Sequence, residues 1–226
     1  MVANISDEEL EEYQNQLDEQ ALKRHDEEEE KRIEAEAESR IQEIFDSIKA
    51  ITDYTLNDNK PKAVKVNYKM QCFIDALLGY TGKATYNDTA LSMKSAEIIE
   101  CACDSFYLCV GGRYRTAYML MRKMLELFAV SDYIDTSGIY KSPESNNWVF
   151  LNDKPPIHII NAIRGIDKNN RLENLYGKLC SFAHNDGTKE YIAIWDGHYK
   201  KEGFDMYAKE MIFLSDYLCD YIKNKK

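Results

Sequence analysis

The chain has no glycine or proline before Pro61, and this absence constrains its fold more than any other feature. Ser6 followed three residues later by Glu9 forms a capping box, and acidic residues in the first turn suit the helix dipole. The sequence therefore predicts one helix from about residue 7 to about residue 52, roughly 70 Å long at 1.5 Å per residue. The stretch "LNDNKPK" at 56–62 is expected to end it.

Two patterns divide the chain at this stretch. Residues 1–58 hold 19 acidic and 6 basic residues, a net charge of −13, whereas residues 59–226 carry a net charge of +3. Apolar residues in the second half of the helix are spaced by 4, 3, 4 and 3, which is a heptad seam. They are Ala37, Ile41, Ile44, Ile48 and Ile51. We predict an acidic helical arm (residues 1–58, with a coiled-coil-like seam at 37–51) and an α-helical bundle (residues 59–226).

The predicted fold class is all-α. Four prolines and ten glycines in 226 residues favour long helices over a turn-rich β architecture. Gly111-Gly112 predicts a tight turn between two antiparallel helices. A short extended piece is expected at "NWVF" (147–150), and one small hairpin near 190–200. The expected helices of the bundle span about 66–80, 90–110, 113–134, 157–166, 169–184 and 204–223.

The composition and motifs of the chain indicate its cellular compartment and exclude several classes of enzyme. There is no run of about 18 apolar residues and no secretory signal, so we expect a cytoplasmic protein without a membrane span. The six cysteines are then expected to be reduced thiols, since they lack the spacing of zinc ligands. Phosphate-binding, dinucleotide-binding and serine-hydrolase motifs are absent, so no cofactor is expected.

Charged residues stand out on the apolar helix at 113–134. Arg115, Arg122 and Glu126 share one line along it, and a charge beside buried surface must be paired or functional. Arg122 and Glu126 could pair with each other at i, i+4. His184 lies in the last turn of the helix at 169–184, where an imidazole either packs structurally or meets Arg122 across the bundle.

These two helices resemble a known family. In "GGRYRTAYMLMRKMLELF" the pattern A-x-x-L-x-R-x-x-x-E is filled by Ala117, Leu120, Arg122 and Glu126. In "LYGKLCSFAH" the pattern Y-x-x-L-S-x-x-x-H is filled by Tyr176, Leu179 and His184, with Cys180 in place of serine. Over about residues 90–186 the chain resembles the HEPN-like helical bundles of prokaryotic abortive-infection and toxin-type proteins.

The resemblance implies an all-α bundle that dimerises and forms a cleft for RNA or a nucleotide. If the protein is an enzyme, the resemblance implies that it is a metal-independent endoribonuclease. His184 would be the base for the 2′-hydroxyl and Arg122 or Lys178 the cation for the phosphate, with Glu126 beside Arg122. Catalytic HEPN ribonucleases carry an arginine four to six residues before the histidine, and here only Lys178 lies there.

Two other interpretations stay open. The acidic arm could dock a basic protein partner, as an inhibitor or a mimic of nucleic acid. Alternatively, the seam at 37–51 could hold a homodimer together, and the arm would then be an assembly device.

Overall fold

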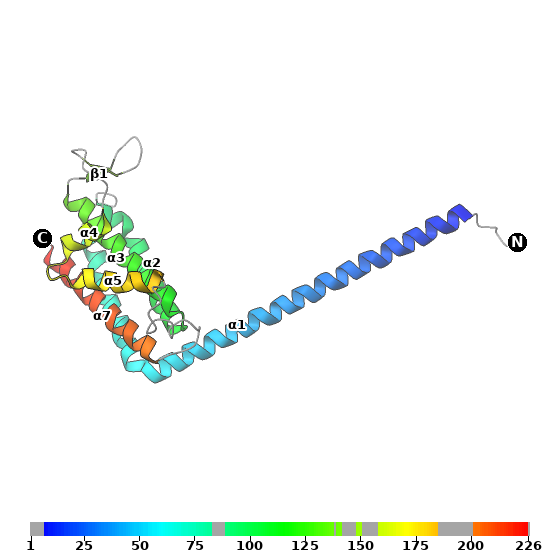
Figure 1. Cartoon of the computed structure of the whole chain (residues 1–226), viewed down its shortest axis with the longest axis horizontal. Helices are drawn as coiled ribbons and strands as arrows, with labels where there is room; N and C mark the ends of the chain where they lie inside the picture. The colour runs from blue at the N-terminus through cyan, green and yellow to red at the C-terminus, as the bar shows by residue number, and fades with distance from the viewer. Residues whose placement is uncertain are drawn as a thin grey trace. The chain divides into compact units, whose positions relative to one another are not determined.

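The computed structural model describes residues 7–82, 89–137, 139–141, 148–150, 158–184 and 201–225. The chain divides into two compact units, residues 1–49 and residues 50–226. We call the second unit the bundle. The boundary precedes the predicted one at residue 58 because side chains in the intervening stretch, such as Thr55, are already buried. Figure 1 shows the order of the elements along the chain.

Helix α1 spans Asp7–Thr81 and provides the long helix that the sequence predicts. In residues 1–49 its polar side chains pair along one helix, with Arg32 bonded to Glu29 and Gln42 to Asp46. Several large apolar side chains of this unit are exposed instead of buried. They are Ile33, Ile41, Ile44, Phe45 and Ile48.

The break predicted at 56–62 is present as a kink, after which the chain continues as helix to Thr81. Only Asn59 leaves helical geometry, with φ −124° and ψ 20°, and Pro61 lies inside the helix just after it. Proline removes one backbone donor and clashes with the preceding turn, which bends a helix without preventing it from resuming. The Asn59 side chain is buried and donates to the Thr55 carbonyl, at 3.3 Å, so a hydrogen bond is kept across the kink.

Helices α2 (Ala90–Val110) and α3 (Tyr114–Thr136) form the predicted antiparallel pair. Gly112 has a φ of 73° in the turn between them, a conformation that favours glycine. At the other end of the pair, the Asp135 carboxylate accepts hydrogen bonds from the backbone N–H groups of Ala90 and Leu91, at 2.6 and 3.1 Å. The two helices are therefore tied together at both ends.

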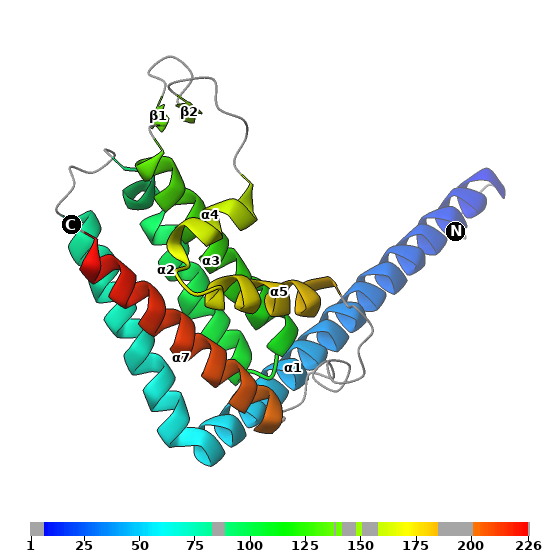
Figure 2. The same ribbon diagram turned by 60° about the vertical axis from the view of Figure 1, so that its left-hand side comes forward.

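Helix α7 (Lys201–Asn224) lies parallel to the part of α1 that follows Asn59 (Figure 2). Lys69 pairs with Asp216 at 2.9 Å, and the Cys219 thiol contacts the Cys72 carbonyl at 3.4 Å. Helices α4 (Ile159–Ile166) and α5 (Arg171–His184) pack on α3. The predicted helices of the bundle are thus all present.

One antiparallel hairpin accompanies the helices. Strand β1 (Ile139–Lys141) pairs with β2 (Trp148–Phe150), which lies within the extended piece expected at 147–150. The hairpin predicted near 190–200 lies outside the described residues. The fold of the described chain is all-α with this small addition. None of its described helices has the length and apolar character that a membrane crossing requires.

The core is aromatic and centred on α3. Tyr114, Tyr118, Met121, Leu125 and Phe128 are fully buried, as expected for the helix at 113–134, which the sequence shows to be apolar. All six cysteines are free thiols, as expected. The core also holds a polar pair that the sequence did not indicate. Ser105 donates to the Ala117 carbonyl at 2.7 Å and lies 3.0 Å from the Tyr207 hydroxyl.

Candidate functional site on helices α3 and α5

Three polar side chains meet where α5 packs on α3. The Arg122 Nε lies 3.1 Å from a Glu126 carboxylate oxygen, and the Tyr176 hydroxyl donates to the same oxygen at 2.8 Å. We call Arg122, Glu126 and Tyr176 the α3–α5 cluster. Its arginine and glutamate side chains are 26% and 20% exposed. The cluster therefore lies at the margin of the core, within reach of a ligand.

Burial and the neighbouring carboxylate both act on the tyrosine. The pKa of Tyr176 is raised, first by burial and then by its hydrogen bond to Glu126. The ionised form of a phenol is disfavoured when it is removed from water and placed beside a negative charge. Tyr176 is therefore a neutral hydrogen-bond donor at physiological pH, and Glu126 accepts from both helices.

Helix α5 lies across α3, the central helix (Figure 2). Tyr176 contacts Glu126, and six residues later Phe182 stacks on Tyr118 with ring centroids 3.9 Å apart and planes 3° from parallel. The last turn of α5 is thus directed toward the half of α3 that carries Arg113 and Arg115, two exposed arginines. His184 is the final residue of this turn.

The structure brings together some of the predicted site residues and separates one. Arg122 and Glu126 are paired, as their spacing indicates. His184 is described by its backbone alone, so a meeting of its side chain with Arg122 stays a prediction. Lys178 points to another helix, because its ammonium lies 3.0 Å from Glu210 of α7. Two positions along a helix differ by about 200°, which places Lys178 opposite Tyr176.

Sequence reasoning missed two features of this region. Phe182 is a core residue, 4% exposed, although the helical pattern did not single it out. Near the far end of α3, the buried Asp132 carboxylate accepts from the Tyr221 hydroxyl at 2.8 Å and pairs with Lys225. The residues of this second cluster are distant in the chain, so no local spacing could have shown it.

No protein-family model, curated protein or solved structure matches this chain. Within the described ranges, no three His, Cys, Asp or Glu side chains are grouped so that they could hold a metal ion. The chemistry that can be argued from the α3–α5 region is therefore that of its arginines, its hydrogen-bonding phenol and carboxylate, and the histidine at the end of α5.

Proposed function

We propose that the protein binds RNA at the surface formed by α3 and the last turn of α5. One observation carries the proposal: the Tyr176–Glu126 bond and the Tyr118–Phe182 stack direct the end of α5 toward the arginine-bearing half of α3. The end of α5, whose final residue is His184, and the arginines of α3 together support the proposal. This is the combination that the resemblance to HEPN-like defence and toxin-type proteins implies.

Charge along α3 supports an anionic ligand. Arg115 and Arg122 are seven residues apart and so lie on one line of the helix, separated by about 10 Å. Arg113 and Arg115 are exposed, and Arg122 is partly exposed. Guanidinium groups match the oxygen geometry of phosphates and bind them through paired hydrogen bonds. A strand following this line would place successive phosphates near the arginines.

In the catalytic version of the proposal, His184 takes part in RNA cleavage that needs no metal ion. In it, the imidazole removes the proton of a ribose 2′-hydroxyl, and the 2′-oxygen attacks the adjacent phosphorus. The bond from phosphorus to the 5′-oxygen then breaks, and water protonates the leaving oxygen. An arginine of α3 stabilises the charge that develops on the phosphate oxygens. Glu126 and Tyr176 position Arg122 and α5 and do not take part in the proton transfer.

The test uses a labelled single-stranded RNA in binding and cleavage assays, with a metal chelator present in the cleavage assay. We expect Arg115→Gln and Arg122→Gln to weaken binding and to lower the slope of log affinity against log salt by about 0.7 for each lost phosphate contact. His184→Ala should abolish cleavage and leave circular dichroism unchanged. Lys65→Gln removes an exposed charge on α1 and serves as the control. A wild-type protein that neither binds nor cleaves RNA would disprove the proposal.

A second candidate is self-association through the N-terminal unit. Ile41, Ile44 and Ile48 of the predicted seam are 52%, 55% and 38% exposed. Coiled-coil pairing buries such a stripe against its copy in another chain, and about 25 cal/mol is gained per Å² of apolar surface covered. Sedimentation of the wild type and of Ile44→Asp tests this candidate. Identical, monomeric sedimentation would exclude the homodimer and leave a basic protein as the partner to seek for the acidic arm.

A further inference from the structure

A groove between α5 and α7 lies on the face of α5 opposite Tyr176. It has a volume of about 250 Å³. Lys178, which the sequence grouped with His184, belongs to this groove. Its lining combines three basic side chains and one carboxylate with apolar surface, part of which belongs to Leu175 and one aromatic ring. The other lining residues are Arg171, Asn174, Lys209, Glu210 and Phe213.

Positive charge exceeds negative charge in the groove. Lys178 pairs with Glu210 at 3.0 Å, and the Glu210 side chain is only 13% exposed, so this carboxylate is already engaged. Across the described part of the chain, neither Arg171 nor Lys209 forms a salt bridge, and both residues are exposed. Among the described residues, these two cations have no carboxylate that neutralises them. An exposed site of this kind attracts an anion.

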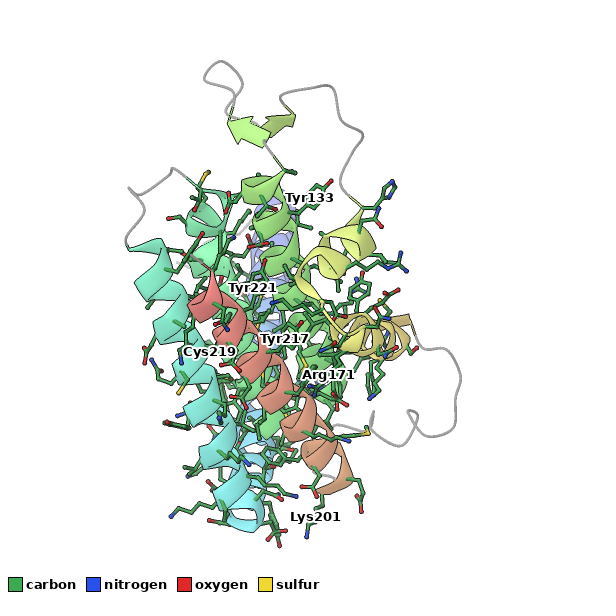
Figure 3. All side chains as sticks on the ribbon, turned by 90° about the vertical axis from the view of Figure 1, so that its left-hand side faces the viewer. Tyr133, Arg171, Lys201, Tyr217, Cys219 and Tyr221 are labelled. Carbon is green, nitrogen blue, oxygen red and sulfur yellow. The ribbon has the colours of Figure 1, made fainter. Side chains whose placement is uncertain are left out.

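An aromatic platform lies beside these cations. The Arg171 guanidinium sits 4.4 Å from the centre of the Phe213 ring, and Figure 3 shows Arg171 at the start of α5 next to α7. Phe213 is held in place by an edge contact with Tyr217, at 5.9 Å between ring centres. Planar groups such as a guanidinium and a phenyl ring are the surfaces on which unpaired nucleobases stack.

The dimensions of the groove suit one unit of a polymer. Pockets that enclose a complete small molecule usually have about 300–1,000 Å³, and this groove is smaller. Arg171 and Lys178 are seven residues apart on α5, so their backbone positions differ by about 10 Å along one line of the helix. Lys178 of α5 and Lys209 of α7 both line this groove, so the two lysines can bind the phosphates on either side of a single base.

We propose that the α5–α7 groove binds one nucleotide of single-stranded RNA. Its base stacks on the outer face of the Arg171 guanidinium, whose inner face lies on the Phe213 ring, and its flanking phosphates contact Lys209 and Lys178. This inference rests on the proposed function and adds to it a second contact, on the other face of α5. RNA bound at the α3–α5 surface would be anchored at a second point by this groove.

The experiment measures fluorescence anisotropy of a labelled single-stranded RNA with the full-length protein over a range of salt concentrations. The double variant Arg171→Gln, Lys209→Gln should bind more weakly and lower the salt slope by about 0.7 for each lost contact. Phe213→Leu keeps an apolar side chain but removes the ring, and should weaken binding about tenfold at every salt concentration. Lys65→Gln on α1 is the charge-matched control, and thermal unfolding confirms that each variant is folded.

The outcomes separate the two proposals. If both groove variants weaken RNA binding and the control does not, the groove proposal is supported. If, in addition, Arg115→Gln and Arg122→Gln have no effect on binding, the α3–α5 surface is rejected and the groove proposal still stands. If only the α3 variants weaken binding, the groove proposal is wrong and the proposed function stands. Polyglutamate that competes as well as RNA, or a Phe213→Leu variant that binds like the wild type, would also overturn the groove proposal, because base stacking would then be absent.

Discussion

Replacing Tyr176 with phenylalanine removes only the hydroxyl that joins α5 to Glu126 of α3. Hydrogen bonds to a charged group contribute about 1.5–3 kcal/mol to stability. Because the Glu126 side chain is 20% exposed and water can partly replace the lost donor, we expect the lower end, about 1.5 kcal/mol. For a chain of this size, that loss corresponds to a fall in Tm of about 3–6 °C.

A double-mutant cycle isolates this bond from the others that Glu126 makes. Urea unfolding, followed by circular dichroism, is measured for the wild type, Tyr176→Phe, Glu126→Ala and the double variant. Replacing Glu126 removes its pairing with Arg122 both in the wild type and in the Tyr176→Phe variant, so this loss cancels. The remaining coupling energy belongs to the Tyr176–Glu126 hydrogen bond. We expect about 1.5 kcal/mol of coupling. Tyr107→Phe is the matched control, because Tyr107 is 71% exposed, and it should change stability by less than about 0.5 kcal/mol.

Additive effects of the two substitutions would refute the reasoning. Glu126 would then be held by Arg122 alone, and the direction of α5 would depend on apolar packing, mainly the Tyr118–Phe182 stack. In that case the α3–α5 cluster would not be a positioning device. The support that it gives to the RNA-binding proposal would be lost with it.

Two further predictions concern backbone conformation and pH. Gly112→Ala should lower the free energy of unfolding by about 1–2 kcal/mol in urea unfolding, since φ is 73° there, while Gly111→Ala, at φ −78°, should cost less. Burial and carboxylate hydrogen bonds raise the pKa of Tyr176 and of Tyr221, so the unfolded chain loses these protons first. The contribution of these two phenols to stability should therefore be constant up to about pH 10 and fall above it, and Tyr221→Phe should reduce the fall above pH 10. An alkaline urea titration in which Tyr221→Phe falls as steeply above pH 10 as the wild type would contradict this.

Much of the helical architecture follows from local signals. The spacing of apolar residues, the scarcity of glycine and the Gly111-Gly112 pair are properties of neighbouring residues, and helix formation depends on such short-range terms. The same signals predicted the break near Pro61, where the chain kinks and then continues as helix. Whether a proline ends a helix or only kinks it depends on packing around the bend, and here the buried Thr55 and Asn59 hold the chain in place after the kink.

The candidate sites required knowledge of distant contacts. The pairing of Arg122 with Glu126 could be predicted because both lie on one helix at i, i+4. Tyr176 could be placed in a motif, but its bond to Glu126 joins residues fifty positions apart. Lys178 was grouped with His184 because they are near each other in sequence, yet it belongs to the groove formed with α7. The stack of Arg171 on Phe213 joins two helices and leaves no local pattern.

The amino-acid order thus accounts for which segments are helical, for the separation of an acidic arm from a near-neutral body, and for the exposed seam at 37–51. Each of these depends on periodicity or on charge counted along the chain, and neither needs a partner from elsewhere in the protein. Packing of the helices selects which side chains face one another: Tyr176 with Glu126, Lys178 with Glu210, and Arg171 with Phe213. Rotation by about 200° between positions two apart sends Tyr176 and Lys178 to different faces, and the neighbours on those faces come from distant parts of the chain.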